Sequence, residues 1–241
     1  MEQCIVNPVR DKRDPELPPL GIFAVNPTDA ANFPTLAERF GLRQHFLFHS
    51  KLYSSDRFFL AGPAVGAPMA AMCLEKCIAL GARYVIVYGW CGAVSDFLAA
   101  GDVFLPTSGI SEEGTSTHYP GADNFAPDVR LVNNVDDVLH QAGYCTKHGP
   151  VWTTDAVYRE TKAKVQRLGD QGIFGVDMEY TALNAIATFR GISLAAVMMV
   201  SDELYHKKWR PQFNWKVFRR KTKQLLTDLC SEADLGGLKG S

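Results

Sequence analysis

Two acidic residues occupy positions where a carboxylate can do chemistry. Asp202 directly follows Ser201 and the apolar run of residues 194–200. A carboxylate there is either the N-cap of a following helix or a functional acid in a pocket. Glu179 lies at the start of a predicted helix, where it is either a surface charge favoured by the helix dipole or part of a site. Both residues are therefore candidates for a functional acid.

Two glycine-containing segments also follow predicted strands. Residues 62–68 contain two glycines and two prolines, and residues 89–93 contain two glycines. Neither segment has the G-x-G-x-x-G spacing with a downstream acid that is typical of a dinucleotide-binding loop. Taken alone, each is equally consistent with a simple turn.

Short apolar blocks separated by turn residues predict an α/β fold with three αβα layers. Several predicted strands are continuously apolar, as expected for strands buried on both faces of a sheet. The carboxyl ends of such strands are where function gathers. The predicted strands are residues 20–25, 44–49, 57–61, 83–88, 102–106, 144–152, 173–176 and 192–199, and the predicted helices are residues 28–40, 67–80, 127–142, 159–169, 178–190 and 212–230.

The composition is that of an ordinary globular protein. The 241 residues carry 25 Lys and Arg against 26 Asp and Glu, and 46% are hydrophobic. This apolar content argues against disorder, and the near-zero net charge argues against a dedicated nucleic-acid or membrane-surface binder. Glycines and prolines interrupt the uncharged run 58–74, which argues against a membrane span. We expect an irregular arm at 1–19, one domain at 20–232 and a tail at 233–241.

The cysteines and histidines do not predict a metal site. The six cysteines are scattered without a C-x-x-C pair, and no histidine pair has a nearby acid on one helix face. Residues 1–19 lack the apolar core of a secretory signal. We therefore expect reduced thiols, a cytoplasmic location and no metal.

Five segments together resemble the nucleoside phosphorylase superfamily. This family includes uridine phosphorylase, hexameric-type purine nucleoside phosphorylase and the methylthioadenosine/S-adenosylhomocysteine nucleosidases. The resemblance covers about residues 20–230 and implies a mixed, partly barrel-like central sheet flanked by helices. The segments are Gly66-Ala67-Pro68 with Leu74-Glu75-Lys76, Gly89-Trp90-Cys91-Gly92-Ala93-Val94, Ala100-Gly101-Asp102-Val103, Val176-Asp177-Met178-Glu179 and Ser201-Asp202.

The resemblance implies cleavage of the N-ribosidic bond of a nucleoside in purine or pyrimidine salvage. Glu179 would accept hydrogen bonds from two ribose hydroxyls, and Met178 would lie against the sugar. Asp202 would be the general acid that protonates the base, at N7 for a purine. The residues expected around the base are Cys91, Gly92, Val157, Tyr158, Arg159, Val176 and Ser201.

The segments that hold phosphate in the phosphorylases differ here. The acceptor pocket would be formed by Gly66, Val87, Gly89 and Trp90. Two family arginines are replaced by Asp29 and Val87, so that phosphate would need Arg43, Lys51 or a residue of a neighbouring copy. An acid such as Asp29 suits activation of water, as in the nucleosidases, although it is equally consistent with ordinary first-turn helix chemistry. The sequence slightly favours water over inorganic phosphate as the acceptor and implies no other cofactor.

Other functions are possible on the same residues. A nucleoside-binding protein without catalysis would keep Glu179 and Asp202 while its acceptor residues change. A dehydrogenase-type fold is disfavoured because the dinucleotide loop is missing. The basic segments 207–210 and 219–221 are better explained as a solvated face than as a nucleic-acid site. We expect a small-molecule nucleoside as the ligand, a homo-oligomer by resemblance, and neither nucleic acid nor membrane as a partner.

Overall fold

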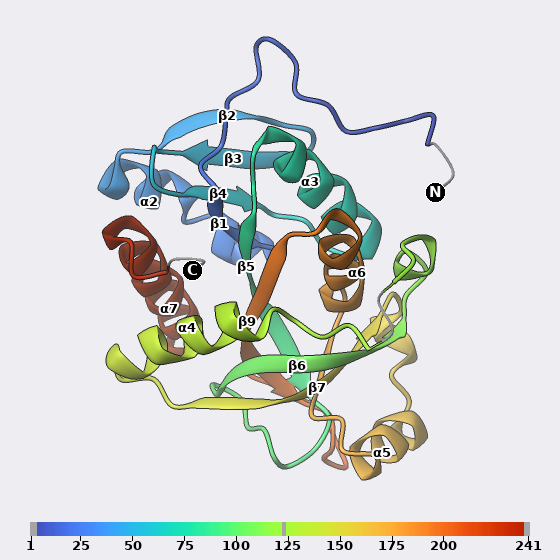
Figure 1. The fold of residues 1–241 in the computed structure, drawn as a ribbon. Coiled ribbons are helices and arrows are strands. Elements are labelled where there is room, and N and C mark those ends of the chain that lie inside the picture. Colours follow the sequence, from blue (N-terminus) through green and yellow to red (C-terminus); the bar gives the residue numbers. More distant parts are fainter. Residues whose placement is uncertain (1–3, 122–123, 239–241) are drawn as a thin grey trace.

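A mixed sheet of ten strands runs through the part of the chain that the computed structural model describes, residues 4–121 and 124–238 (Figure 1). The strands are β1 (Leu20–Ala24), β2 (Arg43–Leu47), β3 (Ser50–Ser54), β4 (Phe59–Gly62), β5 (Tyr84–Ala93), β6 (Val103–Glu112), β7 (Thr146–Thr154), β8 (Gly175–Asp177), β9 (Ser193–Glu203) and β10 (Arg210–Pro211). Their order is β10-β9-β6-β7-β8-β5-β1-β4-β3-β2. An additional pairing of β9 with β5 closes β5, β9, β6, β7 and β8 into a ring, which confirms the mixed, partly barrel-like sheet.

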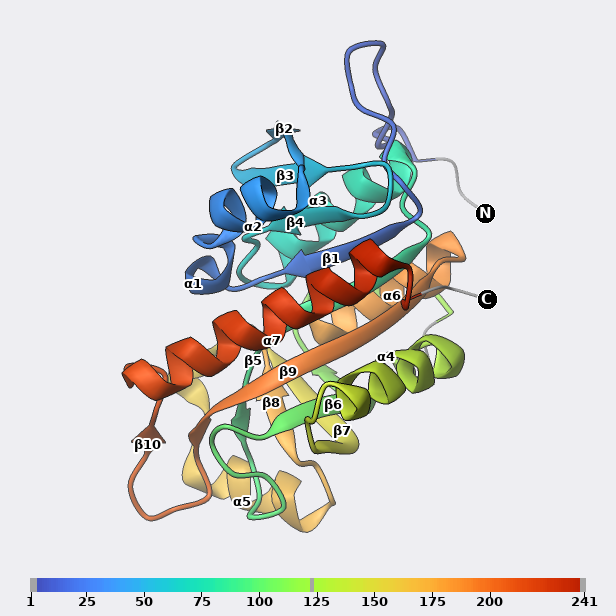
Figure 2. The same ribbon diagram turned by 90° about the vertical axis from the view of Figure 1, so that its left-hand side faces the viewer.

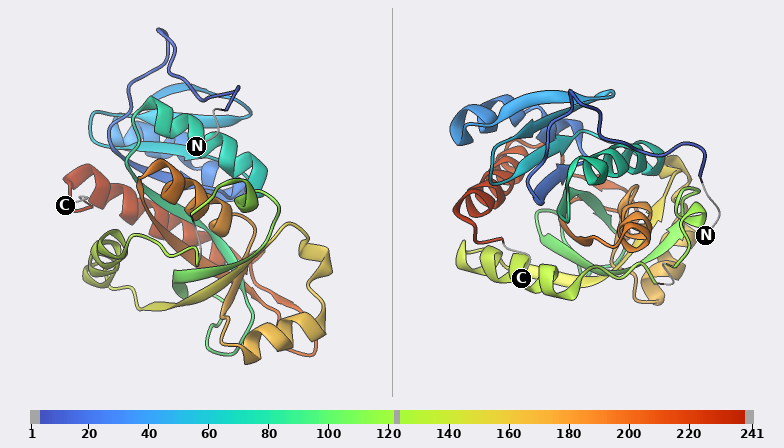
Figure 3. Two further views of the ribbon diagram at one scale, coloured as in Figure 1. Left: turned by 45° about the vertical axis from the view of Figure 1, so that its right-hand side comes forward. Right: turned by 45° about the horizontal axis from the view of Figure 1, so that its top comes forward.

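Helices cover both faces of this sheet, as Figures 2 and 3 show. The side chains of α3 and α6 belong to one apolar cluster, and those of α2, α4 and α7 to a second. These two clusters are the cores between the three expected layers. The helices are α1 (Pro27–Ala30), α2 (Phe33–Phe40), α3 (Ala67–Leu80), α4 (Val129–Gln141), α5 (Lys162–Asp170), α6 (Tyr180–Arg190) and α7 (Lys216–Leu235).

The central strands β1, β5 and β9 are apolar along most of their length because both of their faces are buried. In β1, Phe23 belongs to the cluster under α3 and α6, whereas its neighbours Ile22 and Ala24 belong to the other cluster. This alternation follows from the two-residue period of a strand. The strands β1 and β5 are parallel, and so are β5 and β9, so their carboxyl ends lie at the same edge of the sheet.

The predicted helix 28–40 is wrong as one element, because the structure divides it into α1 and α2. Pro34 stands at the start of α2, where its missing N–H is tolerated, whereas inside a longer helix its ring would clash with the preceding turn. The strands β3 and β10 were not predicted. β3 follows β2 in a hairpin after Phe48, which adopts a positive φ of 38°.

The C-terminal helix was predicted at 212–230 and lies at Lys216–Leu235 instead. It continues into the expected tail because Ala233 packs into the core, and Leu238 beyond the helix is buried as well. The helix predicted at 159–169 begins three residues later, since the Thr161 hydroxyl caps it through the N–H of Lys164. Residues 1–3 of the expected arm and 239–241 of the expected tail lie outside the described residues.

None of the helices within residues 4–121 and 124–238 combines the length and apolarity of a membrane span. In the same part of the chain, no group of three or more His, Cys, Asp and Glu side chains is placed to hold a metal ion. Cys73 and Cys77 are buried in the core beside α6, as their helical spacing predicts.

Candidate active site

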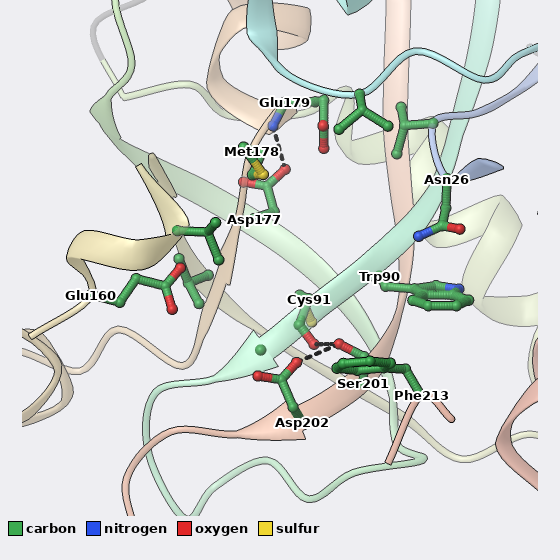
Figure 4. A pocket seen from close by; sticks show the side chains of 15 residues that line it. Asn26, Trp90, Cys91, Glu160, Asp177, Met178, Glu179, Ser201, Asp202 and Phe213 are labelled. Atoms are coloured by element: carbon green, nitrogen blue, oxygen red, sulfur yellow. Dashed lines mark hydrogen bonds between the residues drawn. The ribbon is translucent and has the colours of Figure 1, made fainter. Parts of the chain in front are cut away.

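A pocket of about 300 Å³ lies where the carboxyl ends of β1, β5 and β9 meet the start of α6. Figure 4 shows Glu179 and Asp202 at opposite ends of it, with Glu160 and Trp90 on its two sides. It is lined by Val25, Asn26, Val65, Trp90, Cys91, Gly92, Val157, Glu160, Val176, Asp177, Met178, Glu179, Ser201, Asp202 and Phe213. The pocket therefore unites four segments that the sequence places at element ends.

The Glu179 side chain is held in place by the backbone N–H of Gly66, the residue that precedes α3. Its carboxylate accepts a hydrogen bond of 2.6 Å from the N–H of Gly66. Gly66 precedes α3 with a φ of +85°, a conformation that strains other residues, so glycine at this position lets the N–H point at Glu179. One oxygen of Glu179 is thereby fixed, which orients the other toward a ligand.

Asp177 organises the backbone around Glu179. Its Oδ2 accepts hydrogen bonds from the N–H groups of Glu179 (3.0 Å) and Tyr180 (2.6 Å), and its Oδ1 accepts one from the Thr153 hydroxyl (2.6 Å). These bonds satisfy free donors at the start of α6. Burial raises the pKa of both Asp177 and Glu179, and the nearby charge of Asp177 raises that of Glu179 further.

Asp202 is anchored near the end of β9 by two side-chain donors. The Ser201 hydroxyl lies 2.5 Å from its Oδ1, and the indole N–H of Trp209 donates to its Oδ2 at 2.7 Å. Burial raises the pKa of Asp202, while the bonds from Ser201 and Trp209 act in the opposite direction. The Asp202 carboxyl therefore holds a proton more readily than a free aspartate. When it is ionised, the donors of Ser201 and Trp209 stabilise the carboxylate.

A bulge in β9, where Ser201 is the extra residue, lets Asp202 reach the pocket. The register between β5 and β9 shifts between Cys91 and Gly92, so that Gly92 lies opposite Asp202. A Cβ at Gly92 would approach the Leu204 Cδ1 to 2.4 Å and an Asp202 oxygen to 3.3 Å. A side chain there would therefore push Asp202 out of place, which explains the glycine.

The charge in the pocket is one-sided. Asp177, Glu179, Asp202 and Glu160 contribute carboxylates, and within the described residues no lysine or arginine lines the pocket. Burial and the charge of Asp202 raise the pKa of Glu160 to about 7, against the opposing charge of Lys164. Such a site favours positive charge that develops in a ligand, and it disfavours an anion.

The end of the pocket near Trp90 is aromatic. The Trp90 ring stacks on Phe213 with centroids 6.5 Å apart and meets Phe218 edge-on at 5.0 Å. Val25 and Val65 complete this wall. Trp90 thus fills part of the expected acceptor region with apolar surface.

Asp29 does not contact the pocket. Its side chain is completely buried and forms no hydrogen bond within the described residues, although Trp90 and Thr222 lie close to it. Burial raises the pKa of Asp29 to about 7, more than these two neighbours lower it. Its assignment as the group that activates water stays a prediction, and this placement gives it no route to a ligand.

Asp29 has a consequence for stability that can be measured. Because its pKa is about 7 in the folded state and near 3.8 in the unfolded chain, the folded state binds the extra proton between these values. Its contribution to the unfolding free energy therefore falls as pH rises from 4 to 7, by up to about 4 kcal/mol. We expect Asp29→Asn to remove this contribution to the pH dependence of the unfolding free energy, measured by urea unfolding at pH 5 and pH 8. Asp170→Asn, at an exposed site, is the control. If Asp29→Asn showed the same change of unfolding free energy between pH 5 and pH 8 as wild type, the expectation would be contradicted.

Most of the predicted site residues line the pocket. They are Asp202, Glu179, Met178, Cys91, Gly92, Val157, Val176, Ser201 and Trp90. Gly66 contacts the site through its N–H only. Val87 is buried in the core, and Gly89, Arg159 and Tyr158 do not line the pocket; Tyr158 is 97% exposed and belongs to a neighbouring cavity. Trp90, Cys91 and Gly92 at the end of β5 all line the pocket, whereas Val87 lies four residues before Cys91 on the same strand face and is packed into the core.

Six lining residues were not among those predicted, namely Val25, Asn26, Val65, Glu160, Asp177 and Phe213. Asn26 stands two residues after β1, as the N-cap of α1, and Asp177 stands two residues before Glu179, so both carried a signal at an element end. Phe213 carried none. It enters the pocket from the segment between β10 and α7, which only the packing of the chain brings there.

Comparison with known proteins identifies the family of the chain. A family model described as "Phosphorylase superfamily" matches residues 19–231. The chain belongs to the phosphorylase superfamily. Within this superfamily, the purine nucleoside phosphorylase DeoD-type of Bacillus cereus (strain B4264) is 30% identical over 157 residues, which are 64% of this chain and 66% of the relative. The match thus spans just under two thirds of that relative's length.

Solved structures of the phosphorylase superfamily share the fold. Uridine phosphorylase from Vibrio fischeri ES114 superposes with a TM-score of 0.76 at 20% identity and covers 93% of each chain. Purine nucleoside phosphorylase from Toxoplasma gondii, solved with immucillin-H, superposes with a TM-score of 0.77 at 17% identity and covers 98% of this chain and 99% of its own. The predicted family and fold class are therefore confirmed.

Proposed function

We propose that this phosphorylase-superfamily protein cleaves the N-ribosidic bond of a nucleoside. The observation that carries the proposal is the placement of Glu179 and Asp202 at opposite ends of one pocket. Glu179 binds the ribose hydroxyls with the oxygen that Gly66 leaves free, and Asp202 lies at the base. Met178 lies against the sugar, and its flexible thioether fits an irregular apolar surface.

Asp202 acts as the general acid. Departure of the base leaves negative charge on it, and a proton delivered to N7 of a purine neutralises that charge. The raised pKa of Asp202 keeps the proton available near neutrality, and the donors from Ser201 and Trp209 stabilise the carboxylate after transfer. The sugar meanwhile develops positive charge, which favours the ionised form of the neighbouring Glu179 and is stabilised by its carboxylate.

We propose inorganic phosphate as the acceptor, on the strength of the names of the curated relatives. The sequence favoured water instead, and water remains a second candidate on one specific observation: the described pocket has four carboxylates and no lysine or arginine. Phosphorolysis would draw its positive charge from Arg43, Lys51 or a second copy of the chain. The expected homo-oligomer and cytoplasmic location stay predictions.

The two acceptors are distinguished by product formation with and without phosphate. Inosine, guanosine, adenosine and uridine are incubated with the protein in a phosphate-free buffer and in the same buffer with phosphate. Strict dependence on phosphate and release of ribose 1-phosphate support phosphorolysis, whereas free ribose in both buffers supports hydrolysis. Tight nucleoside binding without either product would contradict the proposed catalysis and support a binding protein.

Trp209 provides a test of the acid through pH. Trp209→Phe removes a donor from the ionised form of Asp202, so the pKa of Asp202 rises. Because the acid acts in its protonated form, the alkaline limb of the kcat profile is expected to move up by about half to one pH unit. Trp215→Phe replaces another exposed tryptophan and is the matched control. If the alkaline limb of the kcat profile stayed at the same pH in Trp209→Phe, Asp202 would not be the group whose pKa sets that limb.

A further inference from the structure

We call the pocket between Glu179 and Asp202 the nucleoside pocket. A second cavity of about 270 Å³ adjoins it at the Asp202 end, where the base would lie. The two cavities share Val157, Glu160 and Asp202, and neither Met178 nor Glu179 lines the second one. The second cavity therefore lies beyond the base, on the side away from the ribose. A group attached to the base would extend into it.

The second cavity contains positive charge beside Glu160 and Asp202, the two acids that it shares with the nucleoside pocket. Lys162 and Lys207 line it, and in the described ranges 4–121 and 124–238 neither lysine forms a salt bridge. Its apolar surface comes from Val157, Val165 and Leu204. Both lysines also line an adjoining open hollow of about 750 Å³, together with Asp96 and Asp170, which gives a longer group room to reach solvent. The cavity can thus accept an apolar spacer that ends in an anion.

Glu160 lies between the two cavities. Its carboxylate has no hydrogen-bond partner among the described side chains, and it lines the pocket together with Asp202. A carboxylate in this place pairs well with an N–H donor on the base, since charge-assisted hydrogen bonds are the stronger kind. A substituted amino group would offer that N–H and continue outward past Val157.

We propose that the substrate is a nucleoside whose base carries a substituted amino group ending in a carboxylate, with the amino N–H bound by Glu160 and the carboxylate by Lys162 and Lys207. This inference rests on the proposed nucleoside cleavage and narrows its substrate class. The plain nucleosides would then be poorer substrates, because they leave the second cavity filled with water and the lysines unpaired.

The test compares adenosine with N6-butyladenosine and N6-(3-carboxypropyl)adenosine, two analogues of similar length that differ in charge. The wild-type kcat/KM for the carboxylate analogue is expected to exceed that for the butyl analogue by about 3- to 30-fold, as ion pairs with two exposed lysines allow. The ratio is expected to fall toward one in the double variant Lys162→Gln/Lys207→Gln and at high salt. Lys216→Gln/Lys223→Gln, on the exposed face of α7, is the control and should keep the wild-type ratio.

A wild-type ratio near one, or a ratio that the Lys162→Gln/Lys207→Gln variant leaves unchanged, overturns the inference. The dissociation constants of the two analogues are also measured by calorimetry, and the affinity of the carboxylate analogue relative to the butyl analogue is judged in the same way. Absence of cleavage for every nucleoside overturns the proposed activity alone, because the binding ratio still decides the substrate class. The two failures are therefore distinguishable.

Discussion

Asp202→Asn is expected to lower kcat for a purine nucleoside by about 10²- to 10⁴-fold, the usual contribution of a positioned general acid. The amide keeps the size of the side chain and can still meet Ser201 or Trp209, but it cannot deliver a proton. Folding is expected to be retained, since Asp202 is only partly buried. Steady-state rates at the optimum pH and circular dichroism of both proteins measure the two effects.

Two substrates separate proton donation from other roles of Asp202. A 7-deazapurine nucleoside has no N7 to protonate, so the wild-type protein should cleave it about as slowly as Asp202→Asn cleaves the natural base. A p-nitrophenyl riboside has a leaving group that needs no proton, and the variant should cleave it nearly as fast as wild type. An equal loss on both the purine nucleoside and the p-nitrophenyl riboside would contradict the general-acid role.

Glu179→Gln is expected to lower kcat/KM by about 10- to 150-fold, because a charge-assisted hydrogen bond contributes about 1.5–3 kcal/mol. The substitution keeps the shape of the side chain but weakens its hold on both the ribose hydroxyls and the Gly66 N–H. Glu38→Gln, on the exposed side of α2, is a matched control that should behave as wild type.

The decisive comparison uses a 2′,3′-dideoxynucleoside. If Glu179 binds the two hydroxyls, the dideoxy substrate and the Glu179→Gln substitution remove the same interaction. The losses in kcat/KM that they cause separately are then not additive when they are combined. The dideoxynucleoside should therefore be cleaved at similar rates by wild type and Glu179→Gln. Full additivity would show that Glu179 supports the fold of the site rather than the sugar.

The sequence predicts the site residues most directly where functional groups and local structural signals coincide. The segment around Glu179 combines a short strand, a capping aspartate and a helix start within a few residues, so its place in the site was predictable. Ser201-Asp202 follows an apolar run long enough to mark a buried strand. In both cases the neighbouring residues along the chain are also the neighbours in space, which is why motif and strand pattern were sufficient.

The orientation of the Asp29 side chain is a feature that the local sequence does not determine. Its position after a strand end indicated a role in the pocket, but the direction of its side chain depends on α1, a helix of four residues that packs beside α7. Thr222, which lies close to Asp29, is 193 residues away in the sequence. A contact of that separation leaves no periodic or local trace in the sequence.

The sequence by itself determined the layered α/β fold, the family and the two carboxylates at the ends of the pocket, because apolar period and short motifs record local structure directly. The tertiary structure decided the rest. A shift of register between β5 and β9 turns Asp202 toward Glu160, and the packing of α7 brings Phe213 to Trp90. The near-zero net charge of the chain also gives no sign of how the charged side chains are distributed. The tertiary structure places four carboxylates in the nucleoside pocket and two lysines in the cavity beside it.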